Sequence, residues 1–174
     1  MVGGMASVEF LAERRQLQPL WNLLLAAATE LGGGAAGYTA LNVTRLEQGI
    51  PWFGYDFGEK QIPHEAGLES SHISYSKGCY TGQEIVERVR SRGQVNRSRV
   101  SLKFDSKEQP ATGTRLLCDG KEFGYVSRAG FSPAANAFIG MGYVRREKTV
   151  PGSVLELDGG GTAIVYAPPS RSAT

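Results

Sequence analysis

Cysteine and histidine are scarce in this chain, and long apolar runs are missing. The 174 residues include two cysteines, Cys79 and Cys118, and two histidines, His64 and His72. Because their spacing is not that of metal ligands, a structural zinc site is not expected. One disulfide is possible, but we expect two free thiols in a reducing, cytoplasmic compartment. The longest apolar stretch, near residues 19–32, contains polar residues and is too short to span a bilayer.

The chain also lacks a large excess of one charge, since it has 19 basic and 17 acidic residues and a net charge of +2. The chain has no phosphate loop, dinucleotide-binding G-x-G-x-x-G, H-E-x-x-H zinc helix or G-x-S-x-G nucleophile elbow. Its N-terminus lacks the basic and apolar regions of a secretion signal. Length and composition indicate a soluble globular protein of one medium domain or two small ones.

The first half of the sequence mixes helical periodicity with glycine-rich and aromatic stretches. Apolar residues recur at helical spacing after Pro19, and the pattern ends at Gly32, so this helix is expected to pack into the core. A later helix has Thr81 as its expected N-cap, with Glu84 completing a capping box. The predicted elements are a short strand at 7–12, a helix at 18–31, a short strand near 39–46, an ordered irregular loop to residue 66 and a helix at 81–90.

The second half has alternating apolar patterns separated by tight turns. Asp119-Gly120, between two such runs, is a strong hairpin signal. Residues 158–161 are expected to join the last pair of strands. We therefore predict a small all-β barrel over about residues 94–168, in a chain whose fold class is α+β.

Cys79 lies between Gly78 and Gly82, just before the helix predicted at 81–90. The free N–H groups and positive end of that helix, with Lys77 nearby, would favour a thiolate. Cys79 is therefore a candidate functional thiol, expected to be accessible and more reactive than Cys118. The alternative is a small buried residue that fits a glycine turn.

The segment TRLEQGIPWFGYDF, residues 44–57, places charged residues among glycines and aromatics. Arg45 could hold a carboxylate or a heterocycle edge through two hydrogen bonds, and the aromatic rings could stack on a planar ligand. The alternative is a surface ion pair between Arg45 and Glu47. The candidate ligand-binding residues are Arg45, Glu47, Trp52 and Tyr55.

Six basic residues form a run between Arg88 and Lys103 and could contact phosphate groups. They also suit the end of a helix followed by an edge strand. No aromatic RNA-recognition pattern accompanies them. Weak nucleic-acid contact is therefore one of two open interpretations of this run.

The octapeptide KGCYTGQE, residues 77–84, resembles the signature of the YgfZ-like folate-binding proteins, relatives of the aminomethyltransferase (T-protein) of the glycine cleavage system. The segment around Arg45 is similar to the family's R-x-E-x-G-x-P-x-x-G-x-D pattern, and Pro63 and Glu65 match a following P-x-E pair. The resemblance covers about residues 8–167. The motif residues are Lys77, Gly78, Cys79, Tyr80, Gly82, Gln83 and Glu84.

The resemblance implies that tetrahydrofolate lies between an α+β body and a C-terminal barrel, with Arg45 lining the site. It also implies a role in assembly or repair of iron–sulfur enzymes, including tRNA-modifying ones, that depends on Cys79. The expected partners are folate and iron–sulfur proteins or their assembly factors. The alternatives are a tetrahydrofolate-dependent aminomethyltransferase and an interaction module that does not bind folate.

Family members are much longer than this chain, so we expect the chain to be the C-terminal half of such a protein, as a fragment or a natural short form. Residues 1–92 would complete the folate-binding α+β domain, 93–168 would form the barrel and 169–174 a disordered tail. Because the half with the family's catalytic acid has no counterpart, classical transferase activity is not expected. Apolar surface left bare would favour self-association.

Overall fold

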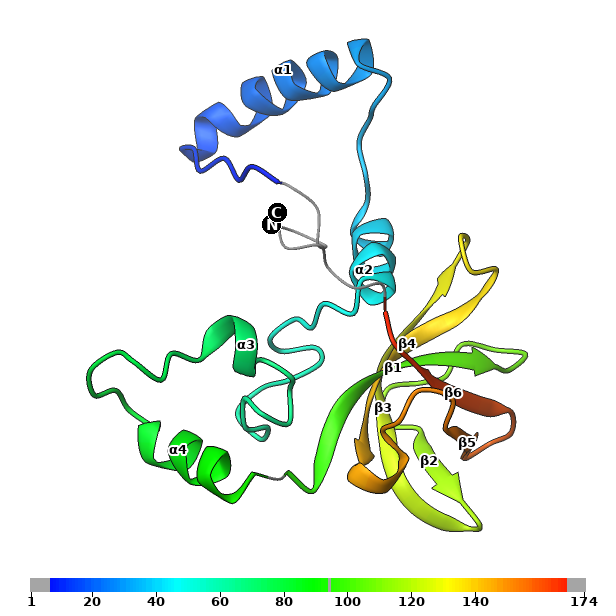
Figure 1. Cartoon of the computed structure of the whole chain (residues 1–174). Coiled ribbons are helices and arrows are strands. Elements are labelled where there is room, and N and C mark those ends of the chain that lie inside the picture. Colours follow the sequence, from blue (N-terminus) through cyan, green and yellow to red (C-terminus); the bar gives the residue numbers. More distant parts are fainter. Residues whose placement is uncertain (1–6, 94, 169–174) are drawn as a thin grey trace.

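The strands predicted in the second half of the chain close into one barrel (Figure 1). The computed structural model describes residues 7–93 and 95–168. Neighbouring strands are antiparallel, in the order β1-β4-β3-β2-β5-β6, and β6 pairs back to β1. The strands are β1 (Arg97–Asp105), β2 (Arg115–Cys118), β3 (Lys121–Ser132), β4 (Ala137–Arg145), β5 (Val154–Leu157) and β6 (Thr162–Tyr166). The predicted barrel and α+β class are confirmed, whereas the tail predicted at 169–174 lies outside the described residues.

Turn chemistry and alternating burial explain why this sequence forms a barrel. Asp119 and Gly120, both with positive φ, make the predicted two-residue turn between β2 and β3. Gly161, at the end of the β5–β6 connection, has a φ of 91°, and a Cβ there would lie 2.6 Å from the carbonyl oxygen of Asp105. The interior is filled by Val100, Leu102, Phe104, Leu116, Val126, Ala129, Val144, Leu155, Leu157, Ala163 and Val165.

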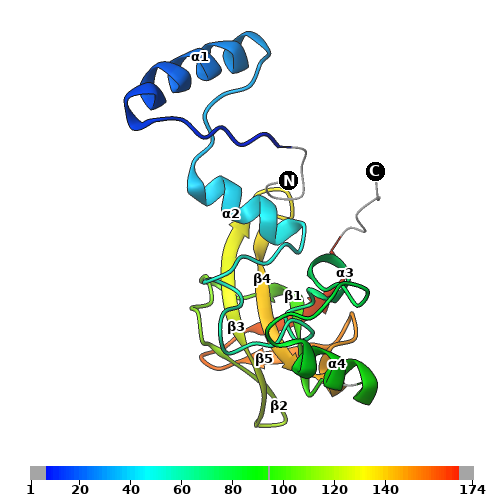
Figure 2. The same cartoon turned by 90° about the vertical axis from the view of Figure 1, so that its left-hand side faces the viewer.

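The segment near residues 39–46 is a helix, and the strand predicted there is wrong. Helix α2 (Tyr38–Glu47) packs on β3 and β4 outside the barrel (Figure 2). Its Leu46 is fully buried and clusters with Ile139 and Met141, and Gly130 of β3 lies beside it. The threonines and valine of this segment favour strands locally, but packing of one helical face against the barrel decides the outcome.

The other helical elements precede the barrel, apart from one short turn within it. They are η1 (Arg14–Gln16), α1 (Leu17–Glu30), α3 (Glu69–His72), α4 (Gln83–Arg92) and η2 (Arg146–Lys148). Helix α1 confirms the helix predicted at 18–31, and Gly32, with a φ of 78°, follows its end. The strand predicted at 7–12 is wrong, because no neighbouring strand pairs with that segment. Within the described ranges, no helix is long and apolar enough to cross a membrane.

Helix α1 stands apart from the barrel in both views (Figures 1 and 2). None of its residues is buried, so the predicted packing of its apolar side into the core is wrong. Trp21 is 51% exposed and Leu23 is 67% exposed. An extended segment after Leu31 separates α1 from α2. Helical periodicity identifies the apolar side of a helix, but it does not say what that side packs against.

We predict that the exposed side of α1 makes the chain self-associate. Burial of several leucine and tryptophan side chains between two copies would remove apolar surface that a monomer rarely leaves exposed. Sedimentation should show a dimer, and Leu17→Glu combined with Leu24→Glu should convert it to a monomer. Val150→Glu, at an exposed apolar position near the barrel, should leave the dimer intact. A compact wild-type monomer that binds no apolar dye would contradict this prediction.

Candidate functional site

Arg45 and Asp56 form a fully buried ion pair between helix α2 and the loop that follows it. Arg45 Nη1 lies 2.5 Å from Asp56 Oδ2, and neither side chain is exposed. Arg45 also donates twice to Asn42 Oδ1, over 3.0 Å from Nε and 2.8 Å from Nη2. Asp56 Oδ2 accepts a further hydrogen bond of 2.9 Å from the backbone N–H of Trp52. Both charges are therefore hydrogen-bonded inside the protein.

The guanidinium of Arg45 needs this compensation because it is buried. Burial lowers the pKa of Arg45, and the attraction of Asp56 opposes that shift. Arginine stays charged in proteins, and an unpaired buried charge would be very costly. The surface ion pair with Glu47 that the sequence left open does not form. Glu47 accepts a hydrogen bond of 2.6 Å from Ser132 Oγ at the end of β3.

The loop after α2 is held against the barrel near both of its ends. Arg99 of β1 donates to the carbonyl oxygen of Ala66 over 2.8 Å and to that of Gly49 over 3.2 Å. Arg97, two residues earlier, makes an ion pair of 3.2 Å with Glu65. The predicted loop is thus confirmed as ordered and irregular. Two arginines of the basic run face this loop and are engaged by it.

The remaining described side chains of the basic run are dispersed. The guanidinium of Arg90 lies 4.2 Å from the centre of the Tyr75 ring and 3.6 Å from Glu87. Arg88 is exposed on α4, and Lys103 is exposed on β1. Among the side chains that the structure describes, the run therefore makes no continuous basic surface of the kind that nucleic acid favours.

Three aromatic rings cluster beside the ion pair. The ring centres of Tyr38, Trp52 and Tyr55 are 5.5–6.2 Å apart. The Arg45 guanidinium lies 4.8 Å from the centre of the Trp52 ring. A hydrogen bond with Tyr55 is the main cause that raises the pKa of Tyr38, while the positive charges of Arg45 and Arg128 oppose it. Tyr38 is therefore a neutral hydroxyl at physiological pH.

A β-bulge in β3 directs two more polar side chains toward this cluster. The pairing of β3 with β4 changes register between Val126 and Arg128, and Val126 and Ser127 are both buried. The Ser127 hydroxyl shares its proton between the carbonyl oxygen of Met141, at 3.1 Å, and Asp56 Oδ1, at 3.3 Å. The guanidinium of Arg128 lies 4.6 Å from the centre of the Tyr55 ring. The bulge thus connects the barrel to both the ion pair and the aromatic cluster.

A cavity of about 290 Å³ lies beside these residues, and we call it the Arg128 cavity. Its wall includes Tyr38, Asn42, Tyr55 and Phe131 as well as Arg128, and no acidic side chain of residues 7–93 and 95–168 lines it. Arg128 Nε is buried and has no hydrogen-bond partner within the described part of the chain. The cavity therefore combines aromatic surface with a cation whose Nε no described group of the protein satisfies.

The structure brings together three of the four predicted ligand-binding residues, Arg45, Trp52 and Tyr55. The site residues that sequence reasoning missed are Tyr38, Asn42 and Arg128. Asn42 lies three residues before Arg45, a spacing that indicates contact on a helix, but the sequence predicts a strand there. The direction of Arg128 depends on the bulge, for which the sequence carries no signal that we can identify.

The octapeptide of residues 77–84 leads into α4, and Cys79 within it is exposed, as predicted. The predicted capping box is wrong. Gly82, with a φ of 90°, is the N-cap, and no side chain caps the helix. Lys77 Nζ lies 4.5 Å from the centre of the Tyr80 ring. Cys118 is a free, half-buried thiol at the end of β2, in agreement with the sequence.

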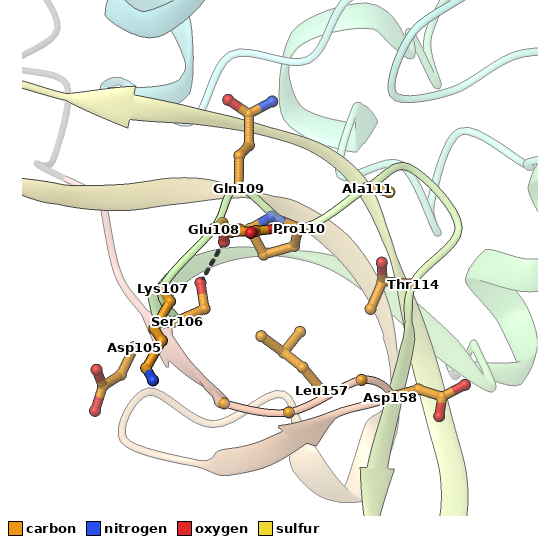
Figure 3. Close-up of a pocket in the computed structure, with 13 residues that line it drawn as sticks. Asp105, Ser106, Lys107, Glu108, Gln109, Pro110, Ala111, Thr114, Leu157 and Asp158 are labelled. Carbon is orange, nitrogen blue, oxygen red and sulfur yellow. Dashed lines mark hydrogen bonds between the residues drawn. The ribbon is translucent and has the colours of Figure 1, made fainter.

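A larger cavity of about 870 Å³ lies at one end of the barrel (Figure 3). Leu157 lies at its centre in this view, and three glycines, 159–161, form part of its rim. Asp105 and Asp158 point away from it on opposite sides. Specific small-molecule sites have polar groups that converge on the ligand, so this cavity is the weaker candidate.

Comparison with known proteins shows which protein domains this chain resembles. Residues 97–169 match the glycine cleavage T-protein C-terminal barrel domain, and residues 3–74 match the GCVT N-terminal domain. The aminomethyltransferase of Halothermothrix orenii is 31% identical over 138 residues, which are 79% of this chain and 38% of that protein. The aminomethyltransferase of Bacteroides fragilis is 30% identical over 156 residues, which are 87% of this chain and 43% of that protein.

The fold agrees with these sequence matches. The crystal structure of the glycine cleavage system aminomethyltransferase T from Bartonella henselae superposes with a TM-score of 0.76 and 26% identity, over 88% of this chain and 43% of that one. The chain is therefore homologous to the aminomethyltransferase T-protein family and carries residues of both of its domains. It spans about two fifths of the length of these relatives.

We predict that Asp56→Asn will destabilise the protein by about 3–5 kcal/mol, because it leaves the buried Arg45 without a charged partner. The matched control is Asp158→Asn, which breaks the exposed 2.7 Å pair with Arg115 and should cost less than about 1 kcal/mol. Urea unfolding measures both changes. Equal losses for the two variants would show that the buried pair has no special importance.

Proposed function

We propose that this chain is a tetrahydrofolate-binding protein of the YgfZ-like branch, and that it supports iron–sulfur enzymes, including tRNA-modifying ones, through the Cys79 thiol. The observation that carries the folate part is the cluster of Tyr38, Trp52 and Tyr55, held beside a cavity by the buried Arg45–Asp56 pair. The homology to aminomethyltransferases supports it. The octapeptide of residues 77–84 supports the choice of branch.

The residues of the cluster fit a folate, which joins flat rings to a carboxylate tail and carries one-carbon units when bound. Trp52 and Tyr55 offer aromatic faces for stacking, and aromatic walls with few polar groups are typical of small-molecule sites. In this proposal Arg45 is a positioning residue: through its ion pair with Asp56 it holds the loop that carries Trp52 and Tyr55. Glu47 is also a positioning residue, because its hydrogen bond with Ser132 holds helix α2 against the end of β3.

The thiol part of the proposal rests on the exposure of Cys79 and on the start of α4. No side chain caps this helix. The N–H groups of Gln83 and Ile85 donate to the carbonyl oxygens of Tyr80 and Gly82, so it is the positive end of the helix dipole that would favour a nearby anion. A solvent-accessible thiol in such surroundings is suited to exchange chemistry with a client protein. Serine at this position would keep the turn but lose that chemistry.

Aminomethyl transfer is the second candidate, because the relatives in the comparison carry that name. Turnover of an aminomethylated lipoyl carrier protein would favour it, whereas folate binding without turnover favours the proposed role. A chain that does not bind folate would be an interaction module, the third candidate. One folate titration and one turnover assay therefore separate the three.

Tetrahydrofolate should bind to the wild-type chain, and Trp52→Ala should weaken this binding about 10-fold because a stacking surface is lost. Anaerobic titration calorimetry measures the change. Phe53→Ala is the matched control, since Phe53 is exposed and packs against Phe57 outside the cluster; it should bind as the wild type does. Unchanged affinity in Trp52→Ala would remove Trp52 from the site.

Cys79 should react with iodoacetamide faster than Cys118, because Cys79 is exposed and Cys118 is half-buried at the end of a strand. The rates are measured on Cys118→Ser and Cys79→Ser, each with a single thiol, across a range of pH. Cys79→Ser should keep the barrel and yet lose support of iron–sulfur enzymes in a complementation assay. Equal rates and full complementation would leave Cys79 as a small turn residue.

A further inference from the structure

Unlike Arg45 nearby, which is paired with Asp56, Arg128 is a half-buried cation that forms no ion pair within the described part of the chain. Its Nε is buried and has no hydrogen-bond partner among residues 7–93 and 95–168. The buried carboxylate of the site, Asp56, is already engaged by Arg45, by the Trp52 backbone N–H and by Ser127. Burying a charge without a partner is costly. An anionic group of a bound ligand would supply the missing partner.

Other hydrogen-bond donors surround the same cavity. Asn42 accepts from Arg45 through Oδ1, which leaves its Nδ2 donors for another acceptor. Tyr38 and Tyr55 also line the cavity, and each carries a hydroxyl that can donate a hydrogen bond. Among the described residues, the cavity is therefore lined by several hydrogen-bond donors and by no acidic side chain.

Helix α2 adds to this preference for negative charge. Tyr38 and Thr39, in its first turn, line the cavity. That turn contains no acidic residue, and no side chain caps the N-terminus of the helix. The positive end of the helix dipole therefore lies at the cavity, and the first turn of α2 supplies no acidic side chain to neutralise it.

We propose that the Arg128 cavity binds a ligand carboxylate, with Arg128 as its cation and the rings of Tyr38 and Tyr55 as the adjoining wall. This inference rests on the proposed function and deepens it: in tetrahydrofolate, the bound group is the carboxylate tail. The planar guanidinium offers two parallel donors to a planar carboxylate. The aromatic wall suits the benzoyl ring next to the tail.

The test uses three probes: tetrahydrofolate, p-aminobenzoylglutamate, which has the tail without the pterin, and tetrahydropterin, which has no carboxylate. Arg128→Gln should weaken the first two by at least about 10-fold, the usual effect of losing a charge-assisted hydrogen bond, and leave tetrahydropterin unchanged. Arg128→Lys keeps the charge and should give an intermediate loss, and it is the second variant should glutamine disturb folding. Arg146→Gln removes an exposed arginine outside the cavity and should bind all three probes as the wild type does.

The outcomes separate this subsite from the folate proposal. Tetrahydrofolate binding that does not depend on Arg128 would overturn the subsite and keep the proposed function. Binding of p-aminobenzoylglutamate through Arg128, with tetrahydrofolate binding no tighter, would keep the subsite and overturn the proposed function. A wild-type chain that binds neither would overturn both. Circular dichroism of each variant establishes that a loss of binding is not a loss of fold.

Discussion

The buried ion pair between Arg45 and Asp56 is the interaction on which the candidate site depends. It joins helix α2 to the loop, and Ser127 links it to the barrel. Because neither charge can be left alone in the interior without a large cost, the loop can move away only if both are solvated. The ion pair also fixes the position of Trp52, because the backbone N–H of Trp52 donates to the same carboxylate.

The barrel serves this site as a rigid support. A loop without regular structure gains its order from fixed groups on a neighbouring sheet, and here Arg99 binds carbonyl groups near both ends of the loop. The β3 bulge adds Arg128, which faces the Tyr55 ring. Helix α1 illustrates the opposite case. It has the sequence of a good helix, but none of its residues is buried in this structure.

Local sequence signals predict the barrel. They fail where contacts between residues far apart in the sequence determine the structure. Turn residues and alternating patterns are local, so the strands of the second half could be read directly. The sequence predicts a strand where helix α2 forms, and a strand would not bring Asn42 and Arg45 into contact. Asp56 lies only 11 residues from Arg45 and within the same motif, yet the pairing depends on a loop whose path no periodicity encodes. Arg128 required a bulge, which shifts a side chain without a sequence signature.

Backbone hydrogen exchange with and without tetrahydrofolate tests the central claim most directly, namely that the ion pair positions a folate site between the loop and β3. The account predicts slower exchange at residues 50–57 and 127–131 when the ligand is bound, and unchanged exchange at residues 105–111 and 159–161 around the cavity at the barrel end. Protection confined to the barrel end, or none at all, would contradict it.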